Sequence, residues 1–335
     1  RSETHLRETA ANGVLYNERF ARLAKELDVV FIPTRPQAKK RFIFRDDQMR
    51  RWPLSFLASL GLFFRGLVFF IQYKWTKSFG EKSTESLHDW AQRKLGPDFT
   101  RYVLSAGIRG IFAISPKKLN ASAVLNSFKA VIANTQNEVR GTWAPQFGMG
   151  QLIQSLYEKL KLKNIIFREQ KIRSLEDLPI DDKNIVVLAT SAWDAAQILK
   201  LESLNKISAI PLLSVTCVWS ETVMVPEAFG CLVNEEDSFF AKGVLFNRSL
   251  FENRGPNASE TWIVGQDFKD SRTDSATKSE SNPTHNLLEV SKNKARSICD
   301  LTDDEIKTKI LSDRQRLTNV GGVEPVEFYV QRWPQ

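Results

Sequence analysis

The stretch from residue 85 to residue 120 constrains the fold of this chain more than any other. Its first part has apolar residues at the spacing of one helix face, and Gly96-Pro97 is expected to end that helix. Asp98 can cap a second helix, which is expected to stop within residues 107–113. Two glycines in that last segment would bring bare backbone close to the element opposite. The stretch therefore predicts two helices and a close backbone contact at the end of the second.

A family resemblance rests on this same block. Residues 85–96 (ESLHDWAQRKLG) and 109–113 (RGIFA) resemble the matching blocks of protoporphyrinogen oxidases, which belong to the flavin-dependent amine oxidase superfamily. The resemblance implies an α/β (α+β) chain that forms part of a two-lobe FAD-binding fold, with a mixed β-sheet substrate lobe and a helical membrane-facing lobe. It also implies that Gly110 lies at the substrate site. Without the resemblance, the block is compatible with an ordinary helical hairpin and a glycine turn.

The resemblance covers about residues 8–335 and divides the chain into four parts. These are the start of the substrate lobe at 1–53, a helical membrane-facing domain at 54–140, part of the FAD-binding lobe at 141–200 and a substrate-binding sheet at 201–335.

Composition limits the partners of the chain. Its 335 residues are 42% hydrophobic and 26% charged, as expected for a folded protein with a large core. A net charge of +8 suits an anionic partner: a membrane surface, nucleic acid or an acidic substrate. Nucleic acid ranks last, because Lys and Arg are spread along the chain instead of clustering with aromatic residues. The three cysteines and three histidines are scattered, so neither a disulfide framework nor a metal site is predicted.

A basic hairpin follows a helix expected over residues 14–31. Strands are predicted at 41–44 and 48–52, joined by a turn at Asp46-Asp47. A similar hairpin in protoporphyrinogen oxidases implies that Arg41 holds a propionate of the tetrapyrrole. A planar guanidinium can grip a carboxylate with two hydrogen bonds. The alternative is a solvated basic cluster shared with Lys39 and Lys40.

Residues 54–73 are the most apolar stretch, with Arg65 in their middle. Three interpretations stay open: a helix lying in a membrane interface, a buried core helix, or a membrane span. A charge at the bilayer centre costs about 2.5–3.5 kcal/mol, which disfavours the span. The aromatic and basic flanks, together with the family's membrane-associated helical lobe, favour the interfacial helix. We therefore expect a cytoplasmic protein peripherally attached to a membrane.

The flavin side of the site is implied by the resemblance alone. Residues 121–140 are predicted to be helical, and Gly148 corresponds to a glycine turn that faces the flavin, although Phe147 replaces the glycine usual before it. A strand pair is predicted over 164–175 and a buried strand over 184–192. The residues assigned to the flavin side there are Ile172, Ala189 and, near the chain's end, Trp333.

The C-terminal part carries the second strong block. Residues 226–256, beginning PEAFGCLV, resemble the family's segment and assign Phe229 and Leu232 to the two sides of the macrocycle, with Ile263 as another wall. Apolar walls suit a flat, mostly apolar tetrapyrrole, but core residues would show the same pattern. A polar surface loop over 270–284 and a helix over 285–318 are also predicted.

The function implied is FAD-dependent oxidation of a porphyrinogen, protoporphyrinogen IX or coproporphyrinogen III, to the porphyrin in heme biosynthesis, with a tetrapyrrole substrate and a homodimer as expected partners. The G-x-G-x-x-G turn that binds the cofactor pyrophosphate does not occur, so the chain is expected to be the interior of a longer protein. Alternatives are another flavin amine oxidase or desaturase, and an inactive, membrane-attached tetrapyrrole-binding remnant. No catalytic acid or base is predicted.

Overall fold

The computed structural model describes residues 5–76, 78–80, 82, 84–135, 141–181, 183–207, 209–265 and 297–333. The helices are α1 (Glu18–Glu26), α2 (Phe56–Thr76), α3 (Leu87–Leu95), α4 (Pro97–Phe99), α5 (Ser105–Phe112), α6 (Ala121–Thr135), α7 (Met149–Leu162), α8 (Ala192–Leu199), α9 (Asn247–Leu250) and α10 (Asp303–Thr318). The strands are β1 (Val14–Leu15), β2 (Phe31–Pro33), β3 (Arg41–Arg45), β4 (Gln48–Arg50), β5 (Thr142–Pro145), β6 (Leu212–Val218), β7 (Gly230–Leu232), β8 (Gly243–Phe246), β9 (Ser259–Gly265) and β10 (Glu327–Trp333).

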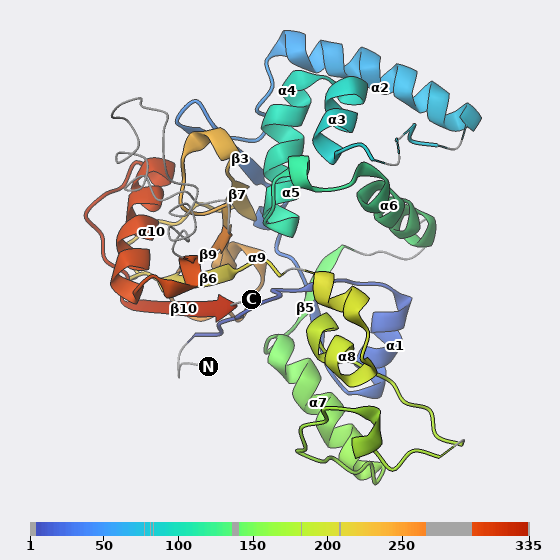
Figure 1. Cartoon of the computed structure of the whole chain (residues 1–335). Helices are drawn as coiled ribbons and strands as arrows, with labels where there is room; N and C mark the ends of the chain where they lie inside the picture. The colour runs from blue at the N-terminus through green and yellow to red at the C-terminus, as the bar shows by residue number, and fades with distance from the viewer. Residues whose placement is uncertain are drawn as a thin grey trace, which may run out of the picture.

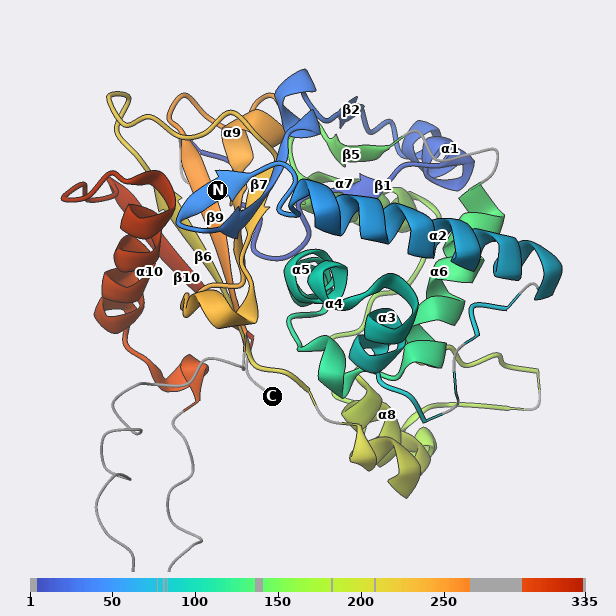
Figure 2. The same ribbon diagram turned by 90° about the horizontal axis from the view of Figure 1, so that it is seen from above.

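A seven-stranded mixed sheet organises the substrate side of the molecule. Its order is β10-β6-β9-β8-β7-β3-β4, with β3 and β7 parallel and every other pair antiparallel. One face packs on α10, where Ile306 and Ile310 join Trp262, Leu213 and Phe44 in the main core. Figure 2 shows the sheet between α10 on one side and α5 on the other. The face turned away from α10 is therefore the one that meets the helical layer, where Gly110 of α5 packs against Leu232.

Two other groups of elements lie beside this sheet (Figure 1). Helices α2 to α6 form a helical layer, with a core of Leu87, Trp90 and Ala121. A three-stranded sheet of order β1-β5-β2 packs with α1 and α7 around Tyr16 and Leu152. A smaller cluster joins the two sheets through buried alanine, leucine and phenylalanine side chains.

The helical block over 85–120 has the two packed helices expected, but the residue expected to cap the second helix was wrong. Gly96, at φ 96°, takes the N-cap position that was assigned to Asp98, because Pro97 already stands at the first helical position. The second helix, which includes a π-helical turn over Thr100–Leu104, continues through both glycines to Phe112. It ends within the expected segment 107–113, where Ala113 adopts a left-handed conformation.

Helix α2 has no buried residue, so the interpretation of residues 54–73 as a core helix was wrong. Among the described residues it is the single helix long and apolar enough to cross a membrane. Only its inner side touches the protein, through residues such as Phe69, which stacks edge-on against Trp90 with ring centroids 5.9 Å apart. Figure 1 shows α2 along the outer edge of the helical layer.

The strands expected over 164–175 and 184–192 are not formed. Both segments are irregular, and the side chains of Ile166, Ile185 and Val187 are 76%, 92% and 81% exposed. An apolar, β-branched sequence becomes a strand only when another strand hydrogen-bonds to it, and no described strand does so. The sequence pattern was that of a buried strand, but the described residues contain no partner strand.

Helix boundaries elsewhere were partly correct. The helix expected over 14–31 is limited to α1, which Asn17 caps by accepting a hydrogen bond of 3.0 Å from the backbone N–H of Phe20. The hairpin at Asp46-Asp47 is confirmed, with both residues at positive φ. The surface loop expected over 270–284 lies outside the described residues, as do the ends of the helices expected over 121–140 and 285–318.

Candidate functional site

The candidate substrate site is the face of the seven-stranded sheet that points away from α10. Directly opposed residues of neighbouring strands share one face, and so do residues two positions apart. The strand register therefore places two parallel rows on this face. The first row is Ile43, Leu232, Gly243, Ile263, Ser214 and Gln331. The second row is Arg41, Gly230, Leu245, Thr261, Thr216 and Tyr329.

The middle of this face is an apolar wall with restricted space. Leu232 and Ile263 are separated only by Gly243, which has no side chain to fill the gap between them. A Cβ on Gly243 would lie 3.2 Å from Cδ2 of Leu232, and one on Gly110 of α5 only 2.4 Å from it. The two glycines thus leave room for Leu232. Leu232 and Ile263 stay half-buried on strands whose other residues are mostly buried.

Arg41 lies at the β3 end of the same face. Its guanidinium carbon is 4.6 Å from the ring centroid of Phe229, an arrangement that holds the side chain by a cation–π contact. Phe229 is fixed in turn by its backbone N–H, which donates to the carbonyl oxygen of Lys40 at 2.8 Å. Arg41 is exposed, and the described residues give it no carboxylate partner. A planar cation beside an apolar wall can bind the carboxylate of a flat ligand.

A polar group at the other end of the rows was missed from the sequence. The hydroxyl oxygen of Ser214 is buried without a hydrogen-bond partner in the described structure, and Gln331 lies opposite it. Both line a cavity of about 250 Å³ that also includes Arg7, whose guanidinium lies 3.8 Å from the ring centroid of Tyr329. The alternation of residues 211–220 could have placed Ser214 opposite the core face. That alternation does not indicate which face of the sheet would hold a ligand.

The structure thus brings Arg41, Gly110, Phe229, Leu232 and Ile263 together around one sheet face. Their proposed contacts with a substrate stay predictions.

The residues assigned to the flavin lie on separate elements. Gly148, at φ 90°, precedes α7, where the backbone N–H of Met149 donates to Oε1 of Glu8 at 2.7 Å. Trp333 ends β10, opposite Leu212. The other two assigned residues, Ile172 and Ala189, belong to the irregular segments described above.

These residues fit FAD only in part. Gly148 provides a bare turn at a helix N-terminus, which is the kind of place where an anionic group binds, and a carboxylate already lies there. A Cβ on Gly148 would come within 2.9 Å of that Glu8 oxygen. Ala189, in contrast, is exposed, and the segments 165–173 and 184–190 form no sheet in the described structure. The described residues therefore supply one plausible contact and no closed cradle for FAD.

A buried ion pair supports the sheet from the core side. Nε of Arg314 lies 3.2 Å from both carboxylate oxygens of Glu260, and Trp262 donates to Glu260 at 3.1 Å. The guanidinium of Arg314 also lies 4.0 Å from the ring centroid of Trp219. Burial raises the pKa of Glu260, and the neighbouring charge of Arg314 opposes this rise. The pair lies on the α10 side of the sheet, so we interpret it as structural.

Comparisons with known proteins bear on the fold. No family model and no curated protein matches the chain. A protein from Exiguobacterium sp. 255-15, assigned provisionally as a protoporphyrinogen oxidase, is 14% identical with a TM-score of 0.66, and the match covers 99% of this chain and 76% of that one. Cyclohexylamine oxidase from Brevibacterium oxydans IH-35A is 12% identical with a TM-score of 0.57, over 94% and 70% of the two chains. An engineered putrescine oxidase is 13% identical with a TM-score of 0.59, over 96% and 73%.

The fold is that of the flavin amine oxidases. The fold class predicted from the sequence is therefore confirmed. Identities this low show the fold alone, so substrate and cofactor have to be argued from the site.

Proposed function

We propose that this chain forms the substrate side of an FAD-dependent oxidoreductase that converts a porphyrinogen into the porphyrin. This proposal rests on one face of the seven-stranded sheet. Four features meet there: the cation of Arg41, the apolar side chains of Leu232 and Ile263, and the bare backbone of Gly110. A tetrapyrrole with propionate side chains is flat, apolar in the middle and anionic at its edge, which matches this arrangement. The likeness in fold to oxidases supports the oxidoreductase class.

The chain's own residues would bind and orient the ligand. Leu232 and Ile263 would contact the ring face and exclude water from it, while Arg41 would pair with a propionate at the edge. A bound flavin would supply the electron acceptor, since the described side chains of the site include none that can accept electrons. The role proposed for these residues is to position the ligand.

A membrane surface is the proposed location. A tetrapyrrole of this type is poorly soluble, and α2 exposes large apolar side chains along its outer side, among them Phe56, Phe63, Leu67 and Trp75. We propose that the protein is peripherally attached through α2, in the cytoplasm, and that it can form a homodimer.

The binding part of this proposal can be tested on the 335-residue chain. Protoporphyrin IX should quench the intrinsic tryptophan fluorescence of the chain and bind more tightly than its dimethyl ester, in which both propionates are blocked. A charge-assisted hydrogen bond contributes about 1.5–3 kcal/mol, so the difference should be about 10- to 150-fold. Equal affinity for acid and ester would show that no cation of the chain grips a propionate.

The oxidase part needs a separate measurement. With added FAD and a porphyrinogen, formation of fluorescent porphyrin above the rate of FAD alone would support an active enzyme. Tight, acid-selective porphyrin binding without any oxidation would instead favour the inactive tetrapyrrole-binding alternative.

A further inference from the structure

A groove runs between α2 and α3, on the side of the molecule that the exposed helix α2 forms. It encloses about 360 Å³ and has a mixed lining of apolar and cationic side chains. Its apolar lining comes from α2, and its polar residues come from both helices. The lining residues are Phe64, Arg65, Val68, Phe69, Gln72, Arg93 and Lys94.

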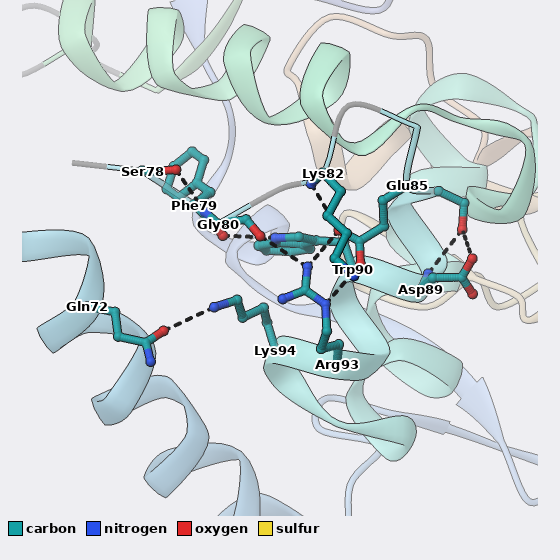
Figure 3. Close-up of polar contacts among 11 residues, drawn as sticks. Gln72, Ser78, Phe79, Gly80, Lys82, Glu85, Asp89, Trp90, Arg93 and Lys94 are labelled. Carbon is teal, nitrogen blue, oxygen red and sulfur yellow. Dashed lines mark hydrogen bonds and ion pairs between the residues drawn. The ribbon is translucent and has the colours of Figure 1, made fainter. Parts of the chain in front are cut away.

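Of the three cationic side chains in this groove, only Arg93 is paired with a carboxylate in the described structure. Arg93 is neutralised by Glu85, whose two carboxylate oxygens accept its hydrogen bonds at 2.9 Å and 2.6 Å (Figure 3). These hydrogen bonds hold the pKa of Glu85 below its usual range. Lys94 only donates to the neutral side chain of Gln72 at 3.0 Å. Arg65 has no hydrogen-bond or ion-pair partner within the described residues. Two positive charges therefore remain uncompensated.

Arg65 is held at the groove although it lacks a partner. A Cβ on Gly96, at the start of α4, would lie 3.2 Å from Nε of Arg65, so the side chain runs across this glycine. Lys94 is similarly close to the backbone of Gly80, where a Cβ would lie 3.0 Å from Nζ. Two residues without side chains thus give the two cations space to lie against the protein surface. Lys94 is half-buried there, whereas Arg65 remains exposed.

The position of the groove around α2 indicates how deep it would lie in a bilayer. The residues of α2 that touch the protein, such as Phe69 and Tyr73, form its inner side, whereas exposed apolar residues form the opposite side. With 3.6 residues per turn, Arg65 and Gln72 lie between these two sides. If the outer side of α2 enters the acyl region, the groove lies at the level of the headgroups.

We propose that this groove binds the headgroup phosphate of an anionic phospholipid, with Arg65 and Lys94 contacting the phosphate and with Phe64 and Val68 contacting the start of an acyl chain. The charge and polarity of the lining indicate this ligand. Two cations without a carboxylate partner attract an anion, and the apolar side chains beside them can contact the acyl chain of a lipid. The inference rests on the proposed membrane attachment through α2 and adds to it a specific lipid class.

The test compares two pairs of charge-removing substitutions on vesicles of phosphatidylcholine, with and without phosphatidylglycerol. Each Lys or Arg close to an anionic membrane surface strengthens binding to that surface about fivefold, whether or not it lies in a specific site. The control pair, Arg51→Gln with Lys74→Gln, should therefore lose about thirtyfold in affinity for the mixed vesicles. The groove pair, Arg65→Gln with Lys94→Gln, should lose at least about a hundredfold, since charge-assisted hydrogen bonds are lost as well. Both pairs remove the same charge from the same surface.

Two further arms identify the ligand. A short-chain phosphatidylglycerol below its micelle concentration should compete with the vesicles, whereas inorganic phosphate at equal concentration should compete at least tenfold less, because it lacks the acyl chain. Phosphate that competes equally well would overturn the lipid assignment. Equal losses for the groove and control pairs would show that the groove contributes only diffuse charge.

Failure of the membrane attachment itself would look different. Substituting Leu67→Ser and Ile71→Ser should reduce binding to both kinds of vesicle, because these exposed residues lie outside the groove. A wild-type chain that binds no vesicle would overturn both inferences. If light scattering then shows a dimer, and cross-linking places the contact on α2, the exposed side of α2 binds a protein partner instead. Vesicle binding with unchanged lipid selectivity in the groove pair would overturn the headgroup site alone.

Discussion

Gly110 on α5 and Leu232 on β7 lie so close together that a methyl group added at Gly110 would overlap the side chain of Leu232. A Cβ on Gly110 would be 2.4 Å from Cδ2 of Leu232, which is shorter than the distance of a van der Waals contact between two carbon atoms. The helical layer and the substrate sheet meet at this point. The position of Leu232 on the candidate site face therefore depends on the absence of a side chain at residue 110.

Gly110→Ala should destabilise the protein, whereas Gly107→Ala should not. Overpacking of this kind costs about 1–3 kcal/mol, and it would also displace Leu232 from the site. At Gly107, on the same helix, no atom beyond the helix's own backbone lies within 4 Å of the Cβ position in the described structure, so alanine should stabilise by about 0.5–1 kcal/mol. Urea unfolding of the two variants measures the difference. Adding Leu232→Ala to Gly110→Ala should relieve the overlap, and equal stability of both single variants would contradict the contact.

Arg41→Ala should remove the preference for protoporphyrin over its dimethyl ester. The guanidinium is held by Phe229 and exposed, so its loss removes a carboxylate contact without opening the core. Affinity for the acid should fall about 10- to 150-fold, and affinity for the ester should barely change. Arg41→Lys should recover only part of the loss, because an ammonium group cannot make the two-pronged contact. Lys39→Ala is the control, and an equal effect there would reduce Arg41 to part of a solvated basic cluster.

The difference between what the sequence predicted and what the structure adds is clearest at three residues. The hairpin of Arg41 was predictable because an alternating strand, a two-residue turn and a return strand are local features. That Leu232 and Ile263 share one face with Arg41 depends on the register of four strands, which pairs residues far apart in the chain. The family resemblance assigned all three to one site, but the residues alone did not place them together.

Other expectations failed where structure depends on a partner. The segments around Ile172 and Ala189 have strand-like composition, yet a strand needs a neighbour, and the described residues provide none. Residues 54–73 were compatible with core, interface or span because an apolar helix satisfies all three by composition. Only the exposure of α2 separated the first from the other two. Ser214 was missed because an ordinary hydroxyl on a strand carries no signal until its surroundings are known.

Ser214→Ala should stabilise the protein and weaken ligand binding. The buried hydroxyl has no partner in the described structure, and such a group costs about 1–3 kcal/mol, so its removal should raise the free energy of unfolding by about 1 kcal/mol. If the hydroxyl contacts the ligand, porphyrin affinity should fall several-fold at the same time. Thr216→Val is the control, since the hydroxyl of Thr216 already lies 3.4 Å from that of Thr261. Unchanged porphyrin affinity in Ser214→Ala would exclude Ser214 from the site.

Arg314→Leu should cost about 3–5 kcal/mol of stability, because it leaves Glu260 buried without its cation. Replacing both residues, with Glu260→Leu added, should recover much of this loss, since an apolar pair needs no desolvated charges. Thermal or urea unfolding of the two single variants and the double variant gives the coupling energy. Additive losses would show that the two side chains act independently, despite the 3.2 Å that separates their charged groups.

Stability should fall as pH rises from about 4 to about 7, and Asp313 should account for part of the fall. Burial raises the pKa of Asp313 to about 7 in the folded protein, and hydrogen bonds from the backbone N–H groups of Phe240 and Ala241 offset only part of this rise. The unfolded chain, with a carboxyl pKa near 4, releases its proton first. The native state thus binds more protons across this interval, so the free energy of unfolding decreases with pH.

The size of the effect follows from the difference between the two pKa values. At about 1.4 kcal/mol per pKa unit, Asp313 contributes up to about 4 kcal/mol at low pH that is lost by pH 7. Asp313→Asn, which keeps one acceptor for the two backbone N–H groups but cannot titrate, should lack this component. Urea unfolding of both proteins from pH 4 to pH 8 provides the comparison, and subtracting the two curves cancels the titration of Glu260. A difference that grows instead of shrinking as pH rises would mean that Asp313 is ionised in the folded protein and that its two hydrogen bonds, not burial, set its charge.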